Sequence, residues 1–109
     1  MSSSHQEPFT RIGVERAKQL VDEGRVEVID IREPAEFAKG HIPKARSAPL
    51  WEIMSRPRDF IKRDTLLFVC EEGLRSNLAC EMAASLGFTE LYSMKEGMPG
   101  WMARGYPIE

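Results

Sequence analysis

The chain has few cysteines, and their arrangement excludes two classes of small protein. Only two cysteines occur among its 109 residues, and they stand as Cys70 and Cys80. They form no C-x-x-C pair, and no histidine lies near either of them in the sequence. Disulfide-rich scaffolds and zinc-binding modules need more cysteines or such paired spacings. We therefore expect reduced thiols, no metal and no cofactor.

The chain also lacks an excess of charge and a long apolar run. Its 15 basic and 17 acidic side chains leave a net charge of −2, so we expect no nucleic-acid partner and no anionic membrane surface as a partner. No apolar stretch approaches the length of a membrane span. Residues 1–6 lack the hydrophobic region of a signal peptide. These absences favour a cytoplasmic protein.

What remains is the composition of an ordinary globular domain. Hydrophobic residues make up 42% of the chain and charged residues 29%. A chain of this length buries roughly two-thirds of its unfolded surface, enough for one core without disulfides. Residues 1–7 are polar and serine-rich, which predicts a disordered tail. We expect residues 8–109 to form one domain, and the protein to be a monomer.

The apolar pattern alternates between short strands and helices. Strands are expected at residues 9–12, 26–31, 45–50, 65–69 and 91–94. Helices or helical turns are expected at residues 14–24, 35–39, 51–54, 58–62 and 76–86, with residues 97–101 as a loop before a final helical turn. Strands separated by helices predict an α/β fold, in which helices cover both faces of a mostly parallel sheet. The carboxyl ends of such strands are where sites form.

The most informative stretch is the junction at Cys70. A buried apolar strand is expected to end just before this cysteine, and a helix over residues 76–86 follows and stops at Gly87. The apolar face expected for this helix consists of Leu78, Ala79, Met82, Ala83 and Leu86. A loop of this kind aims backbone N–H groups and the positive helix end at the sulfur, which favours thiolate over thiol. Arg75 adds a permanent positive charge. The alternative is that Cys70 is simply a small buried residue, but the loop and Arg75 favour a nucleophile.

Three residues of the loop after Cys70 have separate predicted roles. Gly73 supplies a backbone conformation that other residues resist. Arg75 would hold an anionic leaving group by paired hydrogen bonds, with a structural salt bridge as the alternative. Ser76 is predicted to be the N-cap of the following helix rather than a catalyst.

Other reactive side chains receive structural interpretations. Asp30 and Arg32 fall at a strand end, where a carboxylate and a guanidinium would tie neighbouring loops together. His41 lies in a turn and is interpreted as structural. Cys80 is interpreted as a small buried residue, with a resolving cysteine as the alternative.

Three segments of the chain resemble motifs of the rhodanese family of sulfurtransferases, and the resemblance covers nearly the whole chain. The segments are residues 30–37 with 40–45, residues 70–76, and residues 87–88 with the closing Gly97…Trp101…Pro107. Each motif alone is weak, but three in the right order are a strong signal. The resemblance implies a three-layer, rhodanese-like α/β fold around a five-stranded, mostly parallel sheet.

The resemblance also implies a function. Cys70 would carry a persulfide, taking sulfane sulfur from a donor such as thiosulfate or a small persulfide and passing it to cyanide or to a small or protein thiol. The substrate would be held by the loop residues Glu71, Glu72, Gly73, Leu74, Arg75 and Ser76. This chain has Glu96 before Gly97 where the family often has a glycine pair. It has two glutamates at 71 and 72, where thiosulfate-using members often have basic residues.

Two other functions use related features. Tyrosine-type phosphatases and arsenate reductases also place a cysteine loop at a helix N-terminus, but with five residues between cysteine and arginine. Here four residues separate Cys70 from Arg75, and two glutamates would repel a dianion. A non-catalytic interaction module of the same fold would have no need of Cys70. A relay of sulfur to a specific protein acceptor stays open beside the small-molecule reaction.

Overall fold

The computed structural model describes residues 7–109. Residues 1–6, which hold nearly all of the expected disordered tail, lie outside the described residues. Within residues 7–109, no helix has the length and apolarity needed to cross a membrane. In chain order the elements are β1 (Thr10–Ile12), α1 (Val14–Asp22), β2 (Glu27–Asp30), α2 (Pro34–Ala38), β3 (Arg46–Ser47), α3 (Leu50–Ser55), the 3₁₀ turn η1 (Pro57–Asp59), β4 (Leu66–Val69), α4 (Arg75–Ser85), β5 (Leu91–Met94) and α5 (Gly97–Ala103).

The strands form one five-stranded sheet in the order β1-β5-β4-β2-β3. Each neighbouring pair is parallel, which confirms the α/β fold with a parallel sheet. β4 is central, and its last residue, Val69, lies opposite Asp30 at the end of β2. On its other side, Phe68 lies opposite Ser93 of β5. The chain therefore leaves β2, β4 and β5 at the same edge of the sheet, where the first residue after β4 is Cys70.

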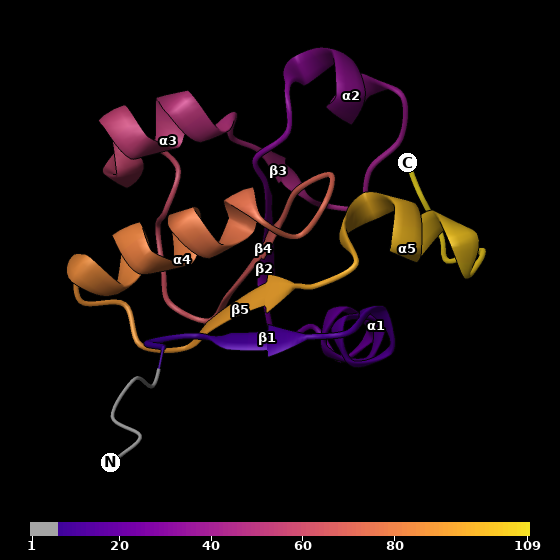
Figure 1. Ribbon diagram of the computed structural model, residues 1–109, viewed down its shortest axis with the longest axis horizontal. Helices are drawn as coiled ribbons and strands as arrows, with labels where there is room; N and C mark the ends of the chain where they lie inside the picture. Colours follow the sequence, from indigo (N-terminus) through magenta and orange to yellow (C-terminus); the bar gives the residue numbers. More distant parts are fainter. Residues whose placement is uncertain (1–6) are drawn as a thin grey trace.

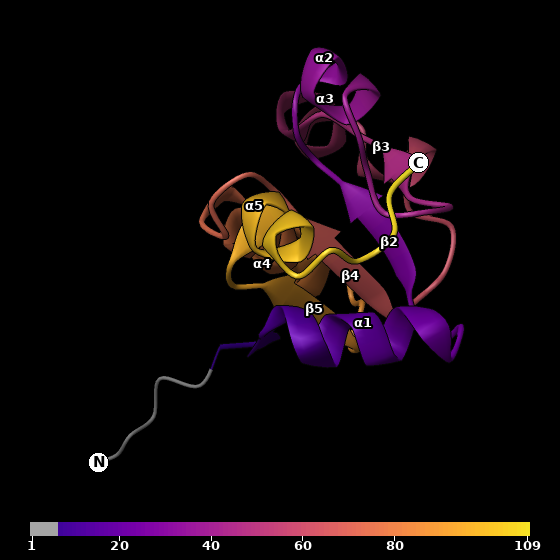
Figure 2. The same cartoon turned by 90° about the vertical axis from the view of Figure 1, so that its right-hand side faces the viewer.

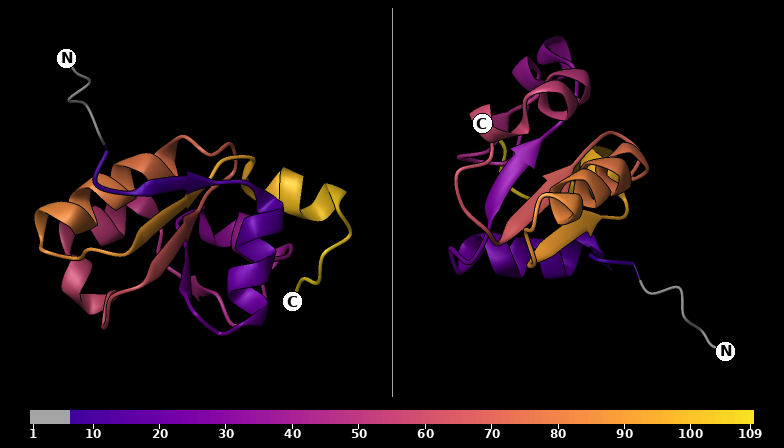
Figure 3. Two further views of the ribbon diagram at one scale, coloured as in Figure 1. Left: turned by 90° about the horizontal axis from the view of Figure 1, so that it is seen from below. Right: turned by 90° about the vertical axis from the view of Figure 1, so that its left-hand side faces the viewer.

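Helices cover both faces of this sheet. α3 and α4 lie together on one face, and α1 and α5 lie on the other (Figure 1). Figure 2 looks onto α1 and α5 in front of β4 and β5, and Figure 3 shows the strands between the two pairs of helices. Leu66, Phe68 and Cys70 pack toward α3 and α4, while Leu67 and Val69 pack toward α1 and α5. Both faces of β4 are buried, which explains its unbroken apolar run.

The helix after Cys70 differs from the expectation in its start and in its buried face. α4 begins at Arg75, and its N-cap position is Leu74, with no side-chain cap. The prediction of Ser76 as N-cap is therefore wrong. The buried face consists of Ser76, Ala79, Cys80 and Ala83, whereas Leu78 is half exposed. α4 packs directly against β5 and β4, and only small side chains fit in that contact.

The segment expected to be a loop at residues 97–101 is instead the first part of α5. Pro99 lies in its first turn, where a missing N–H costs no intrahelical hydrogen bond. Trp101 is buried, and its indole N–H donates to the Pro107 carbonyl at 2.8 Å. Glu96 accepts the Val14 N–H at 3.1 Å, so its carboxylate caps the start of α1.

Candidate active site

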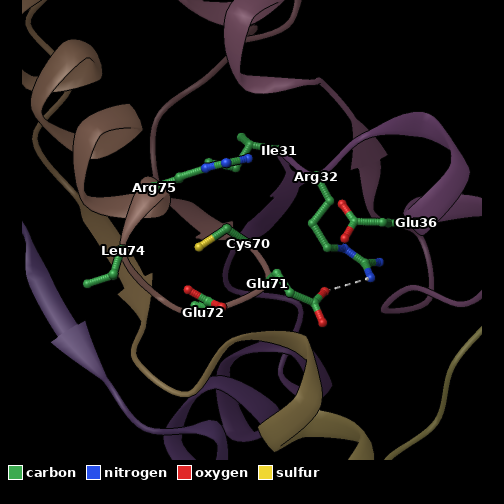
Figure 4. A pocket seen from close by; sticks show the side chains of 8 residues that line it. All are labelled: Ile31, Arg32, Glu36, Cys70, Glu71, Glu72, Leu74 and Arg75. Atoms are coloured by element: carbon green, nitrogen blue, oxygen red, sulfur yellow. Dashed lines mark ion pairs between the residues drawn. The ribbon is translucent and has the colours of Figure 1, made fainter.

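Cys70 lies at the carboxyl end of the central strand, at the floor of a cavity (Figure 4). Cys70 is only 2% exposed. The sulfur accepts the Gly73 N–H at 3.0 Å and the Ser76 N–H at 3.4 Å. These two donors come from the loop and from the first turn of α4, so the turn from strand to helix curls around the sulfur. Such an arrangement stabilises negative charge on sulfur.

Two glycines allow this loop to lock against the turn that follows β5. Gly73 has φ +80° and Gly97 has φ +68°. A Cβ added to Gly73 would overlap the Lys95 carbonyl, and one added to Gly97 would overlap the Glu71 carbonyl. The Met98 N–H completes the contact by donating to the Cys70 carbonyl at 3.0 Å. The shape of the sulfur cradle therefore depends on both turns.

The cavity above Cys70 measures about 350 Å³ and is lined from two sides. Four of the loop residues expected to bind substrate line it with Cys70: Glu71, Glu72, Leu74 and Arg75. The other two, Gly73 and Ser76, lie buried behind the sulfur. From the opposite side come Ile31, Arg32 and Glu36.

Sequence reasoning missed Ile31 and Glu36 as cavity residues. Both belong to the segment that follows β2, and the end of β2 adjoins the end of β4. They could have been found from the expectation that the strands at 26–31 and 65–69 are parallel neighbours, because the residues after two such strands lie close together.

Asp30 and Arg32 form a buried ion pair beside the cavity. Arg32 donates to both Asp30 carboxylate oxygens at 2.9–3.2 Å and to the Gly40 carbonyl at 2.7 Å. Burial acts to lower the pKa of Arg32, but the hydrogen bonds and charge of Asp30, with Glu71 adding, hold it above its usual value. Arg32 thus joins the end of β2 to the turn after α2. Its other nitrogen lies 3.6 Å from Glu71, whose charge it partly compensates.

Arg75 is the other cationic side chain of the cavity. It is exposed, and in Figure 4 its side chain extends toward Ile31. Arg32 already has carboxylate partners, whereas no ion pair of Arg75 occurs among residues 7–109. The salt bridge that was the structural alternative for Arg75 therefore has no partner in the described part of the chain.

The remaining reactive side chains lie away from the cavity. Cys80 is fully buried, its S–H donates to the Tyr92 carbonyl at 3.4 Å, and burial raises the pKa of its thiol. His41 stacks on Phe37 with ring centroids 3.7 Å apart, and its Nδ1 lies 2.9 Å from the Phe37 carbonyl. In residues 7–109 there is no cluster of three or more side chains placed to hold a metal ion.

The fold and the site together define a class: a parallel α/β domain with one thiol held by backbone N–H groups at the end of its central strand. A family model described as "Rhodanese-like domain" matches residues 13–104. The chain belongs to this family, as the three sequence motifs predicted.

Individual relatives agree with this assignment. The chain is 36% identical over 105 residues to a thiosulfate sulfurtransferase, GlpE, of Pseudomonas putida, covering 93% of this chain and 91% of GlpE. It is 30% identical over 104 residues to the putative sulfur carrier protein YrkF of Bacillus subtilis, covering 94% of this chain but only 56% of YrkF. The structure of the human single-domain sulfurtransferase TSTD1 superposes with a TM-score of 0.75 at 27% identity, over 86% of this chain and 96% of that one. The similarity of both sequence and fold thus extends over most of the domain.

Proposed function

We propose that the protein is a sulfurtransferase in which Cys70 carries sulfane sulfur. The Cys70 thiolate attacks the outer sulfur of a donor, a new S–S bond forms, and the donor's own bond to that sulfur breaks with its electron pair leaving on the donor remnant. An acceptor thiolate or cyanide then attacks the terminal persulfide sulfur, and the Cys70 thiolate leaves. No proton needs to be gained or lost by Cys70 in either step.

One observation carries this proposal: the Cys70 sulfur accepts N–H bonds at 3.0 and 3.4 Å while facing a cavity of about 350 Å³. The N–H groups favour the anionic nucleophile, and the cavity admits a small donor or the thiol of a larger acceptor. The names of GlpE and TSTD1 describe sulfurtransferases, which supports the same chemistry here.

The charges around the cavity bear on the choice of donor. Glu36, Glu71 and Glu72 contribute carboxylates, and Glu71 lies 3.6 Å from Arg32, whose charge is already shared with Asp30. A thiosulfate dianion is repelled by these carboxylates and attracted by Arg75. Because the carboxylates outnumber Arg75, we propose that a persulfide donor of lower charge reacts more efficiently than thiosulfate.

The direct test is to incubate the purified protein with thiosulfate or with a small organic persulfide and to measure its intact mass. We expect one added sulfur atom, located on the peptide that contains Cys70. Adding a thiol acceptor should remove it as a new persulfide, from which excess thiol releases sulfide as a disulfide forms. A protein that gains no sulfur from any donor in such a panel would contradict the proposal.

Arg75→Ala should raise the KM for thiosulfate about tenfold, the effect of losing one charge-assisted contact to the sulfonate end. The change should be smaller for an uncharged persulfide donor. Steady-state kinetics with both donors check this expectation. Arg58→Ala is the matched control, because Arg58 is exposed on η1 and does not line the cavity. A lower melting temperature with unchanged kinetics would instead favour a structural role for Arg75.

A further inference from the structure

A buried chain of hydrogen bonds runs from Cys70 into the contact between α4 and β5. The Cys70 sulfur lies 3.5 Å from the Ser76 hydroxyl. That hydroxyl lies 2.7 Å from the Ser93 hydroxyl, which donates to the Asn77 side-chain oxygen at 2.7 Å. Ser76 and Ser93 are fully buried. Because no water reaches them, their hydroxyls have to find their hydrogen-bond partners among the groups of this hydrogen-bonded chain.

Each hydroxyl has one proton to donate, so the groups at the two ends of the hydrogen-bond chain decide in which direction all of its hydrogen bonds point. The Asn77 oxygen can only accept, so the single Ser93 proton is directed to it. Ser76 must then donate to Ser93, and its oxygen has only lone pairs to offer the sulfur. In this direction the chain is matched to a Cys70 thiol, whose S–H donates to Ser76.

A thiolate requires the opposite direction. It has no proton, so Ser76 must donate to the sulfur and Ser93 must donate to Ser76. Asn77 can then satisfy Ser93 only by presenting its NH₂ group. A side-chain amide can do this by rotating about its last bond, because its oxygen and nitrogen differ little in size. Both hydroxyls reverse by rotation alone, without movement of a heavy atom.

We propose that Asn77 is a positioning residue that acts on Cys70 through Ser93 and Ser76 and lets the chain reverse as the sulfur changes state. This rests on the proposed function. When the thiolate takes up sulfur, its electron pair becomes the new S–S bond, and Cys70 Sγ becomes a poor acceptor. Ser76 then turns back to Ser93. When the acceptor removes the terminal sulfur, the electron pair returns to Sγ, and Ser76 donates to it again.

The test replaces Asn77 with an acceptor that cannot donate. Asn77→Asp keeps the size but holds Ser93, and hence Ser76, in the direction that fits the thiol. On a Cys80→Ser background, whose hydroxyl can still donate to Tyr92, we expect the iodoacetamide alkylation rate of Cys70 at neutral pH to fall about fivefold. The pH of half-maximal alkylation should rise accordingly. Mass spectrometry of the folded protein reads this change directly, whether or not sulfur transfer occurs.

Two controls distinguish an effect transmitted through the hydrogen-bond chain from a direct electrostatic effect of the added carboxylate. Leu78→Asp places a carboxylate at the neighbouring exposed position of α4 and should change alkylation much less. In a Ser93→Ala background the chain is cut, so adding Asn77→Asp should have no more effect than Leu78→Asp. The charged cavity residues are the same in every variant: Arg32, Glu36, Glu71, Glu72 and Arg75.

The outcomes are decisive in either direction. An Asn77→Asp effect that persists without Ser93, or that equals the Leu78→Asp effect, would show charge acting through space and overturn the proposal. If Asn77→Asp does not fold, Ser76→Ala supplies the second measurement. It removes the hydroxyl donor next to the sulfur and should slow alkylation by a similar factor. Unchanged alkylation in Ser76→Ala would also overturn the proposal.

Discussion

Replacing Cys70 with serine should reduce sulfur transfer by at least about a thousandfold, because an unactivated hydroxyl is a far weaker nucleophile than a thiolate. Serine is close in size and can accept the same Gly73 and Ser76 N–H bonds, so the melting temperature should change little. Incubation with a donor should add no sulfur to this variant. Activity and intact mass together measure the effect.

Cys80→Ser is the matched control for this variant and should keep most of the activity. Cys80 lies on the buried face of α4, its S–H is bound to the Tyr92 carbonyl, and burial raises the pKa of its thiol, which disfavours the reactive anion. Full activity without Cys70, or equal persulfidation of Cys80, would contradict the role of Cys70 as the sulfur carrier.

The fold could be predicted because its strongest signals are local. The apolar runs at 65–69 and 91–94 contain β4, which is buried on both sides, and β5, in which Tyr92 alone is half-buried, and helices separate the strands as the periodicity indicated. Parallel strands then bring their carboxyl ends to one edge. The positions of Cys70 and Asp30 at that edge followed from chain order alone.

The interior of the site could not be predicted because it depends on packing between distant segments. The apolar face expected for α4 included Leu78, which is half exposed, whereas the close contact with β5 buries the polar Ser76 beside Cys80, whose burial was expected. Ser93 was one polar residue within an apolar strand, and nothing local indicated that it meets Ser76. A buried hydroxyl needs a partner, but the sequence does not say which segment supplies it.

Gly73 could be predicted from the sequence only in part. Its unusual backbone conformation was expected from its place in a tight loop, and the structure has it at φ +80°. Its close approach to the Lys95 carbonyl was not foreseeable, because that contact joins the turn after β4 to the turn after β5. The conformational and steric requirements can be separated by experiment.

Gly73→Ala should be the most damaging single methyl addition near the site. The positive φ costs about 1 kcal/mol for alanine. The overlap with the Lys95 carbonyl cannot be relieved by rotating a side chain, because the obstacle is backbone. We expect a loss of about 3 kcal/mol in the free energy of unfolding, or roughly 15 °C in melting temperature. Displacement of the Gly73 N–H from the sulfur should also lower kcat/KM about a hundredfold or more.

Gly24→Ala isolates the conformational part of this effect. Gly24 has a similar φ, +67°, but a Cβ there would meet nothing within 4 Å. Gly24→Ala should therefore lower the free energy of unfolding by about 1 kcal/mol, or the melting temperature by roughly 5 °C, and should leave the activity unchanged. Gly97→Ala, which would meet the Glu71 carbonyl from the other side of the same contact, should resemble Gly73→Ala in both measurements. If Gly73→Ala behaves like Gly24→Ala instead, the two turns do not depend on each other, and the cradle around Cys70 is held by its own loop alone.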